Sequence, residues 1–403
     1  MSANLPKQVV ILAGGRGTRL GDITRHIPKP MVPFYGKPFI QYLIEYFRDE
    51  GGIKRFLILL GYLSEKVTDY FGDGTEFGVE IEYDITAVEN ETGTRLRSAI
   101  PKVDDYFLMV YCDNYCPIPL AKMADAYHAA GTLAQVVVYQ NNDGYTKSNL
   151  RVENGRIVVY DKSRVTENLQ GVEIGFLLAQ KAVLEMIPKH GNPSFERTVF
   201  PQLIAANQFA AFPTEHRYYS VGKVARLPLT EQFLARHPTI LLDRDGVLNK
   251  KAPKACYIEK WDDWEWLPGA LQAIALLRKA GYRLLIISNQ AGIARGKMTE
   301  DDLTDIHKHM LEDIRSVGGD IDKIYYCPHG WNDGCDCRKP SIGMFLQAQR
   351  EYHLDLSRTT YIGDDERDGI AARRANCGFQ MVDESRSLLD VVTELLNKEN
   401  KHV

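Results

Sequence analysis

Apolar runs of strand length alternate with amphipathic stretches of helix length along the whole chain. In the first half the apolar runs lie at residues 8–15, 55–61, 106–114 and 133–140, and in the second half at 238–246, 283–290, 323–328 and 359–365. Helical patterns lie between them, as at residues 38–52 and 269–282, and a last helix is expected from residue 388 to the end. This alternation predicts α/β sheets with parallel strands.

The hydrophobic pattern also predicts a domain boundary near residue 238. The stretch "LPLTEQFLARHP" predicts a last helix that ends at His237 and Pro238, and "TILLDRDG" then begins a new strand that leads into a charged loop. A strand followed by such a loop is how an α/β domain begins its active site. We therefore expect two domains, residues 1–237 and 238–403, which agrees with the length of the chain.

The composition is that of a globular protein, with 44% hydrophobic and 25% charged residues and a net charge of −4, and it does not favour a nucleic-acid partner. No apolar run approaches the roughly 18 residues that span a bilayer, so we expect a cytoplasmic protein without a membrane partner. The residue types leave the formation of a homo-oligomer open. In a reducing compartment, clustered cysteines among the seven present indicate metal binding or catalysis rather than disulfides.

The first candidate site is a glycine-rich loop, "LAGGRGTRLGDITRHIPKP", directly after the first apolar run. Its glycines allow a sharp turn whose successive amides can cradle an anion. Arg19 and Lys29 follow. The planar guanidinium of Arg19 can donate two parallel hydrogen bonds to phosphate oxygens, and the ammonium of Lys29 supplies a compact positive charge. The loop lacks the G-K-[ST] ending of a P-loop. Small phosphorylated molecules are therefore the expected ligands.

The motifs "LAGGRGTRL", "PKPMVP" and "GKPFIQY" resemble the sugar-1-phosphate nucleotidyltransferase family, with the likeness spanning roughly residues 7–235. That family has a Rossmann-like fold with a mixed sheet and joins a nucleoside triphosphate to a sugar 1-phosphate with release of pyrophosphate. The resemblance implies that Arg19 and Lys29 hold phosphates and that Asp113 binds Mg²⁺. The further nucleotide and sugar contacts that it implies are Leu12, Ala13, Gly14, Gly15, Gly93, Thr94, Asp161, Lys162, Glu173 and Gly175.

Two features depart from the family's pattern. In "YYSVGKVARL", Ser220 stands where the family usually has a second metal-binding aspartate, and Lys223 stands in place of a threonine. In "ETGTRL", Arg95 and Leu96 stand where many relatives have small residues, a pattern similar to that of cytidylyltransferases. A cytidylyltransferase for a sugar or polyol phosphate, and a nucleotide-sensing domain without turnover, therefore remain open.

The second candidate site collects polar residues that follow apolar runs in the second half. Asp243 and Asp245 are two apart, so that an extended chain would present both on one face. A nucleophilic carboxylate, a hydroxyl, a lysine and an acidic group, each at a strand end or in a loop, form a set suited to phosphoryl transfer. The set comprises Asp243, Asp245, Ser288, Lys339, Asp364, Asp365 and Asp368.

This set resembles the haloacid dehalogenase phosphatase superfamily over about residues 239–390. The resemblance implies that Asp243 attacks phosphorus and forms an aspartyl-phosphate, while Asp245 protonates the leaving oxygen and then activates water. It also implies that Ser288 and Lys339 hold the phosphoryl oxygens. Mg²⁺ would be bound by Asp243, the backbone carbonyl of Asp245 and Asp364.

Within the superfamily, "SNQAGIARG", "YYCPHG", "CDCRKPSIGM" and "GDDERD" resemble the histidinol-phosphate and heptose-bisphosphate phosphatases. The resemblance implies a structural Zn²⁺ site of the Cys₃His type, which would fix the loop that carries Arg338 and Lys339. Its ligands would be Cys327, His329, Cys335 and Cys337, with substrate contacts from Asn289, Gln290, Arg295 and Arg338. A redox pair or a plain loop is the alternative interpretation of these cysteines.

Together the two halves predict consecutive reactions. A phosphatase would convert a sugar bisphosphate, in the closest resemblance heptose 1,7-bisphosphate, to the sugar 1-phosphate. A nucleotidyltransferase would then join that product to a nucleotide, with GTP as the expected donor and a GDP-heptose as the product. The expected partners are therefore small molecules: a nucleoside triphosphate, a sugar phosphate and a sugar bisphosphate.

Overall fold

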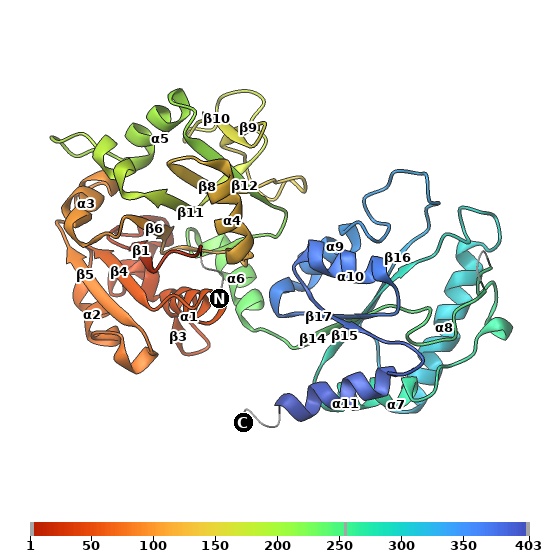
Figure 1. Ribbon diagram of the computed structural model, residues 1–403. Helices are drawn as coiled ribbons and strands as arrows, with labels where there is room; N and C mark the ends of the chain where they lie inside the picture. The colour runs from red at the N-terminus through yellow and green to blue at the C-terminus, as the bar shows by residue number, and fades with distance from the viewer. Residues whose placement is uncertain (1–3, 254–255, 400–403) are drawn as a thin grey trace. The chain divides into compact units, whose positions relative to one another are not determined.

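The computed structural model describes residues 4–253 and 256–399 and divides the chain into two compact units, Met1–Leu234 and Ala235–Val403 (Figure 1). The last helix of the first unit, α6 (Leu227–Leu234), is shorter than the helix predicted from the sequence. Arg236 has a left-handed backbone with a φ of 50°, which does not continue a helix. The predicted closing helix is α11 (Leu388–Glu399), and the rest of that prediction, residues 400–403, lies outside the described residues.

The first unit is built on a sheet of nine strands. Four parallel strands form one side of it: β5 (Glu80–Ile85), β4 (Arg55–Leu60), β1 (Gln8–Leu12) and β6 (Tyr106–Tyr111). The long strand β11 (Val172–Gln180) pairs antiparallel with β6 and with β8 (Ala134–Tyr139). The sheet continues with β12 (Phe209–Thr214), β10 (Arg156–Tyr160) and β9 (Leu150–Glu153). It is therefore a mixed sheet, as the family resemblance implied.

Helices cover both faces of this sheet, and alternate residues of its strands point to opposite faces. In β1, Val9 and Ile11 belong to one apolar cluster and Val10 and Leu12 to another. The first cluster includes residues of α1 (Phe39–Gly51) and α4 (Leu120–Ala130), and the second includes residues of α3 (Thr92–Ala99) and α5 (Phe195–Ala205). The sheet thus forms the middle layer of an α/β sandwich, whose strands β1 and β6 end side by side.

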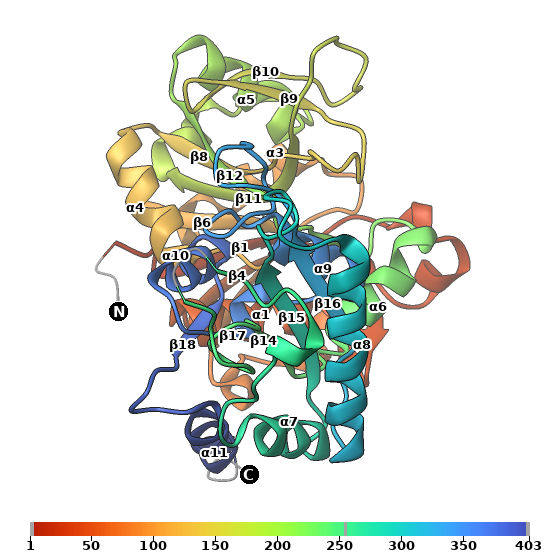
Figure 2. The ribbon, with the colours of Figure 1, turned by 90° about the vertical axis from the view of Figure 1, so that its right-hand side faces the viewer.

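The second unit has a parallel sheet of five strands in the order β16-β15-β14-β17-β18. These strands are β14 (Thr239–Leu242), β15 (Arg283–Asn289), β16 (Lys323–Cys327), β17 (Thr360–Gly363) and β18 (Gly378–Met381). Figure 1 shows α9 (Gly343–Tyr352) and α10 (Glu366–Ala375) on one face, and Figures 1 and 2 show α7 (Ala270–Lys279) beside α11 on the other. The helix α8 (Glu300–Ser316) contributes to the same apolar cluster as α7. Strands β15, β14 and β17 therefore present their carboxyl ends at one edge, flanked by helices.

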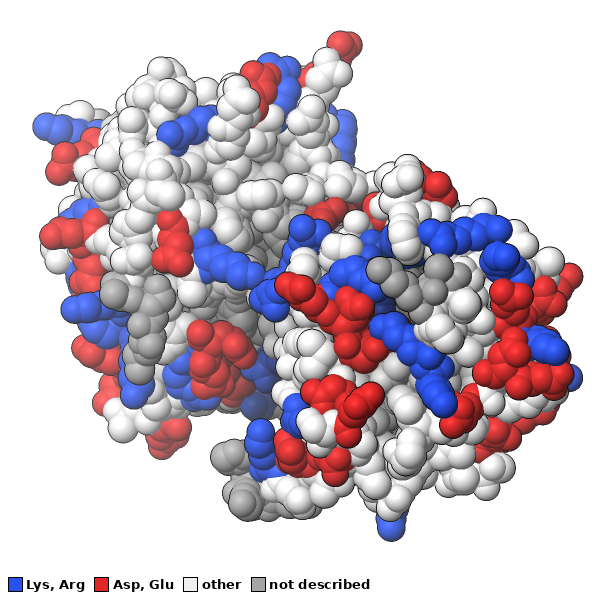
Figure 3. All heavy atoms as spheres, turned by 45° about the vertical axis from the view of Figure 1, so that its right-hand side comes forward, with Lys and Arg blue, Asp and Glu red and all other residues white. Residues whose placement is uncertain are grey.

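The sequence prediction of an α/β fold in two parts is confirmed. In the described part of the chain, no helix combines the length and the apolar character needed to cross a membrane. Figure 3 shows basic and acidic side chains interspersed over the face that it presents of each unit. The exact domain boundary, the cytoplasmic location and the oligomeric state stay predictions.

Candidate active sites

The glycine-rich loop of the first unit borders a cavity of about 400 Å³. The loop leaves the end of β1, and the neighbouring strand β6 ends beside it, with Leu12 paired to Tyr111. Of the residues predicted from the sequence, the cavity is lined by Leu12, Gly14, Gly15, Arg19, Lys29 and Asp113. Ala13 is buried, and its amide donates to the carbonyl oxygen of Leu59. The structure thus brings the predicted phosphate-binding and metal-binding residues to one cavity.

Asp113 is the carboxylate at the centre of this group. The Lys29 ammonium forms an ion pair with it and donates to its Oδ2. A methyl group built on Gly222 would lie 3.7 Å from Asp113 Oδ2 and 3.8 Å from both Arg19 Nη2 and Ser220 Oγ. The serine that replaces the expected second aspartate therefore faces the same small space as Asp113 and offers a hydroxyl there in place of a carboxylate.

Gly93 and Thr94, expected near the base, lie in the first turn of α3 and contact a different segment. The Gly93 amide donates to the carbonyl oxygen of Pro193 at 3.0 Å, and Thr94 Oγ1 donates to Asn192 Oδ1 at 2.8 Å. A side chain at position 93 would come within 2.7 Å of the Pro193 oxygen, so the glycine permits this close packing. Glu91 and Thr92, just before them, line the cavity instead.

A second cavity of about 410 Å³ in the first unit is lined by Asp161 and Lys162. The Asp161 carboxylate accepts hydrogen bonds from Ser163, Val165 and Thr166, which lower its pKa, and it therefore closes the local turn. Lys162 Nζ instead lies 3.4 Å from Glu196 Oε2. Glu196, at the start of α5, lines the same cavity.

Glu196 is a buried carboxylate that connects three segments. It accepts hydrogen bonds from Thr92, Tyr111 and Ser194 in addition to Lys162. Burial alone would raise its pKa, but Lys162 and the hydroxyls of Ser194 and Tyr111 together lower it. Because Tyr111 also lines the cavity beside Asp113, Glu196 links the two cavities of the unit.

Glu173 and Gly175 lie where β11 has an irregular register beside Tyr111. Gly175 has a φ of 85°, and a side chain there would overlap the Tyr111 ring, so only glycine fits this contact. Its amide donates to Glu173 Oε1. Burial, together with the charge of Glu196, raises the pKa of Glu173 to about 7. Two nearby carboxyl groups thus have pKa values displaced in opposite directions.

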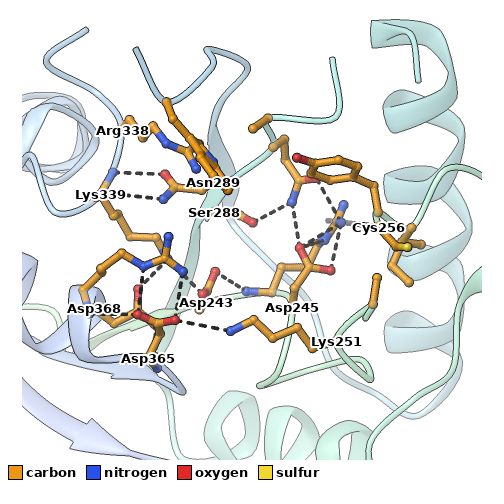
Figure 4. A pocket seen from close by; sticks show the side chains of 18 of the residues that line it. Asp243, Asp245, Lys251, Cys256, Ser288, Asn289, Arg338, Lys339, Asp365 and Asp368 are labelled. Carbon is orange, nitrogen blue, oxygen red and sulfur yellow. Dashed lines mark hydrogen bonds and ion pairs between the residues drawn. The ribbon is translucent and has the colours of Figure 1, made fainter. Parts of the chain in front are cut away.

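In the second unit, three strand ends assemble the predicted phosphoryl-transfer residues (Figure 4). Asp243 follows β14, Ser288 is the next-to-last residue of β15, and Asp364 follows β17. Because these three strands are parallel neighbours, their carboxyl ends meet at one edge of the sheet. The edge opens into a cavity of about 500 Å³ that is lined by Asp243, Asp245, Ser288 and Lys339 among others.

Lys339 is the buried cation of this site. Its ammonium lies 2.9 Å from Asp243 Oδ2 and 2.9 Å from Asp368 Oδ1, and it donates to the carbonyl oxygen of Ile287 at 3.0 Å. Burial alone would lower the pKa of Lys339, but the two carboxylates raise it. Burial raises the pKa of Asp243 to about 7, although Lys339 opposes this shift. The lysine thus allows several carboxyl groups to lie together.

Asp245 points away from that cluster toward a second cation, Arg244. The Arg244 guanidinium is 1% exposed and donates to both Asp245 oxygens at 3.0 Å. Asn249 and Gln290 donate to the same carboxylate at 3.0 and 2.9 Å. Burial alone would raise the pKa of Asp245, but these partners, Arg244 first, lower it. The arrangement therefore favours an ionised Asp245, ready to accept a proton.

Three carboxyl groups in the second unit could hold a metal ion, and each offers one oxygen within 4.8 Å of the others: Asp243, Asp364 and Asp368. Asp364 Oδ1 is buried without a hydrogen-bond partner, while its Oδ2 accepts from Lys251 at 2.8 Å. Gly246, with a φ of 92°, packs so closely that a side chain would come within 2.2 Å of Asp364 Oδ2. An unpaired buried carboxylate oxygen beside other carboxylates suits a hard cation such as Mg²⁺.

Cys327, His329, Cys335 and Cys337 form the other potential metal group, with donor atoms within 4.8 Å of one another. Cys327 Sγ lies 3.6 Å from Cys335 Sγ and 3.2 Å from Cys337 Sγ, and His329 Nδ1 lies 3.2 Å from Cys337 Sγ. Zn–S bonds of about 2.3 Å in a tetrahedron place neighbouring sulfurs about 3.8 Å apart, so this group has nearly that size. Among the described residues, groups of this kind occur only here and at Asp243, both in the second unit.

The four predicted substrate contacts of this unit differ in how far their side chains are already bound by other protein groups. The Asn289 amide accepts from the backbone of Lys339 at 3.0 Å and donates to it at 3.1 Å, so it fixes the lysine (Figure 4). Gln290 is occupied by Asp245, Ser288 and Arg244. Arg295 lies over the Trp331 ring at 4.3 Å. Arg338 lines the cavity, so of these four residues it is the one best placed to meet a substrate.

Glu196, Arg244 and Lys251 are among the residues of these sites that were not predicted from the sequence. Glu196 is distant in sequence from Lys162, and no motif joins the two. Arg244 stands between the two predicted aspartates, and its burial as a partner of Asp245 depends on the tertiary structure. Lys251 follows the same loop and reaches Asp364, over 100 residues away.

Comparison with known proteins gives a separate match for each half. Residues 8–165 match the family model described as nucleotidyl transferase. Residues 239–386 match the model described as polynucleotide kinase 3 phosphatase. The chain is 43% identical over 143 residues to the D-glycero-beta-D-manno-heptose-1,7-bisphosphate 7-phosphatase of Bordetella bronchiseptica, which is 36% of this chain and 79% of that protein.

Two solved structures are also similar. The crystal structure of D,D-heptose 1.7-bisphosphate phosphatase from B. bronchiseptica, complexed with magnesium and phosphate, is 36% identical with a TM-score of 0.38 and covers 40% of this chain and 99% of its own. The crystal structure of HddC from Yersinia pseudotuberculosis is 23% identical with a TM-score of 0.49 and covers 57% of this chain and all of its own.

Proposed function

The chain belongs, through its second unit, to the family of D-glycero-beta-D-manno-heptose-1,7-bisphosphate 7-phosphatases, and we propose that it is a bifunctional enzyme of nucleotide-sugar synthesis. The second unit would remove the 7-phosphate of a heptose 1,7-bisphosphate. The first unit, a nucleotidyltransferase domain, would join the resulting heptose 1-phosphate to a nucleotide and release pyrophosphate. The prediction of these two families from the sequence is confirmed.

One observation carries this proposal: a single chain holds a site for each of two reactions, of which the second uses the product of the first. Removal of the 7-phosphate leaves a sugar 1-phosphate. A sugar 1-phosphate is the substrate class of the nucleotidyltransferase family that the glycine-rich loop resembles. The cavity beside Asp113 offers Arg19 and Lys29 for a triphosphate, and the second cavity offers Lys162 for a sugar phosphate.

In the phosphatase, Asp243 Oδ would attack phosphorus and displace the sugar oxygen, which takes a proton from Asp245. Water then attacks the aspartyl-phosphate, gives its proton to Asp245 and releases inorganic phosphate and free Asp243. Asp245, held ionised by Arg244, is arranged here for the second, base-catalysed half. Lys339 and Ser288 would hold the phosphoryl oxygens, and Arg338 the rest of the substrate.

Asp243 and Asp364 would hold Mg²⁺ in this unit, and the unpaired, buried Asp364 oxygen supports this assignment. When bound, it neutralises phosphoryl charge and acts as a Lewis acid. The backbone carbonyl of Asp245 stays a predicted ligand, and Asp368 is a further carboxylate in the group. In the first unit Mg²⁺ would be bound by Asp113 and the triphosphate.

Zn²⁺ would be held by the Cys₃His cluster in a structural role, since four protein ligands leave no open position. The cluster begins on the last residue of β16 and ends one residue before Arg338. A metal at this point would fix the short loop that delivers Arg338 and Lys339 to the cavity.

A matrix assay tests the proposal. Heptose 1,7-bisphosphate, with Mg²⁺ and each of the four nucleoside triphosphates, is supplied to the full chain, and phosphate and pyrophosphate release are measured separately. We expect phosphate release in every case and pyrophosphate release with GTP. Pyrophosphate release with CTP instead would favour the cytidylyltransferase alternative, and heptose 1-phosphate supplied directly separates the two steps.

Ser220 favours one alternative, in which the first unit binds a nucleotide without turnover. Its hydroxyl faces the Asp113 space where a second carboxylate would strengthen metal binding. Pyrophosphate release by the natural chain would exclude this alternative. If no nucleotide and sugar phosphate gave release, but Ser220→Asp did, the first unit would be a sensor that has lost a metal ligand.

A further inference from the structure

Arg95 is a buried guanidinium in the first unit that the proposed reaction does not yet use. It lies on α3 and is 3% exposed. Its Nη1 donates to the carbonyl oxygen of Leu60 at 2.8 Å and to Thr86 Oγ1 at 2.7 Å. Its Nη2 donates to the carbonyl oxygens of Gly14 at 3.1 Å and Val88 at 3.0 Å. One side chain thus joins the glycine-rich loop, the end of β4 and the segment after β5.

The guanidinium also packs directly against two glycines. A methyl group on Gly14 would lie 2.3 Å from Arg95 Cζ, and one on Gly61 would lie 2.6 Å from Arg95 Nη1. Neither position can carry a side chain while Arg95 keeps its place. The close packing of the glycine-rich loop is therefore complementary to this arginine.

The contacts of Arg95 fix the orientation of the loop. The Gly14 carbonyl oxygen accepts from the Tyr62 amide at 3.2 Å as well as from Arg95, so two protein donors hold it. A carbonyl occupied in this way does not turn its negative end toward a phosphate. Residues 88–92 line the same cavity as Gly14 and Gly15, and Arg95 holds Val88 as well as Gly14. The side chain therefore sets the spacing between the two walls of the cavity.

Arg95 also has no carboxylate partner within 4.0 Å in the described part of the chain. Burial lowers its pKa, while the charges of Glu89 and Glu91 oppose that shift from the cavity wall. A buried charge without a paired counterion is costly, and an anionic ligand nearby offsets part of that cost. The cavity beside Arg95 is the place where the triphosphate would bind.

We propose that Arg95 is a positioning residue for the nucleoside triphosphate, which fixes the spacing of the two cavity walls and supplies a buried positive charge below the glycine-rich loop. The inference rests on the proposed transferase function of the first unit. The presence of Arg95 where many relatives have a small residue would then change the affinity for the nucleotide. The sugar phosphate, at Lys162 and Glu196, would be unaffected.

The test uses Arg95→Lys and Arg95→Met in the full chain, with Arg97→Met as the matched control. Arg97 lies on the same helix and donates to the carbonyl oxygens of Pro188 and Gly191, away from the cavity. We expect the KM for the nucleotide to rise about ten-fold or more in both Arg95 variants, because charge-assisted hydrogen bonds are lost. The KM for heptose 1-phosphate should stay within about two-fold, and Arg97→Met should change neither.

Two further measurements keep the outcome clear. Phosphatase turnover of each variant reports whether the second unit is intact, the KM for heptose 1-phosphate reports whether the rest of the first unit is intact, and calorimetric titration with each Mg-nucleotide measures binding without turnover. If the natural chain binds a nucleotide but releases no pyrophosphate, the transferase proposal fails while the Arg95 proposal is still tested by binding. Equal rises in both KM values, unchanged nucleotide binding in Arg95→Met, or no nucleotide binding by the natural chain would each overturn the Arg95 proposal.

Discussion

His307 should make the stability of the second unit depend on pH. It lies on α8, is 9% exposed, and its Nε2 is 3.4 Å from Nη1 of Arg244, the partner of Asp245. Burial, followed by the charge of Arg244, lowers the pKa of His307 to about 3. An unfolded histidine has a pKa of about 6.5. Between these values the unfolded chain binds a proton that the folded chain excludes, so stability is lost as the pH falls below about 6.5.

The magnitude follows from these two pKa values. Relative to pH 7.5, the contribution of His307 to the free energy of unfolding should fall by about 1.4 kcal/mol at pH 5.5 and by about 2.7 kcal/mol at pH 4.5. The variant His307→Gln cannot take up this proton. Between pH 7.5 and 5.5, wild type should therefore lose about 1.4 kcal/mol more stability than the variant does.

Tryptophan fluorescence during urea unfolding measures the stability of the second unit selectively. All four tryptophans belong to that unit: Trp261, Trp264, Trp266 and Trp331. Ile306→Val is the matched control, since Ile306 is the fully buried neighbour of His307. It should lower stability by about 0.5–1.5 kcal/mol by the same amount at both pH values. Equal losses for wild type and His307→Gln on acidification would refute the reasoning.

Three further outcomes are expected. Asp243→Asn should lower phosphate release about a thousand-fold or more and leave pyrophosphate release unchanged, and a fall in both rates of the folded variant would contradict independent sites. Metal analysis should find about one zinc per chain, lost in Cys337→Ser but kept in Cys256→Ser, whereas a gently purified chain without zinc would exclude the cluster as a zinc site. Glu196→Gln should raise the KM for the sugar phosphate about ten-fold and the KM for the nucleotide far less. In a Lys162→Met background, Glu196→Gln should not raise the KM for the sugar phosphate further. An additive rise in that KM would show that Glu196 does not act through Lys162.

The sequence predicted positions at strand ends well, because parallel neighbouring strands bring their carboxyl ends to one edge. Asp243, Ser288 and Lys339 meet there as expected. The partners that each side chain contacts at this edge were harder to predict. Asn289 holds the backbone of Lys339, a use set by the pairing of β15 with the loop beyond β16.

Contacts between distant segments explain the remaining differences. Gly93 and Thr94 resemble a nucleotide-binding motif, yet their polar atoms meet the loop at residues 192–193, which no local pattern announces. Arg95 was singled out as a departure that pointed to the base, and the structure uses it against backbone carbonyls. A guanidinium donates equally well to a ligand or to a carbonyl, so its partners depend on what the fold brings near.

Gly246 has a consequence for how this site can change over generations. Its positive φ requires glycine, and its close approach to Asp364 excludes a side chain for a second, separate reason. A residue that tolerated the positive φ at position 246 would still collide with the Asp364 carboxylate. A side chain at position 246 would therefore have to displace the Asp364 carboxylate or distort the loop after β14, so a tolerated change at position 246 is expected to be accompanied by a change at or beside Asp364.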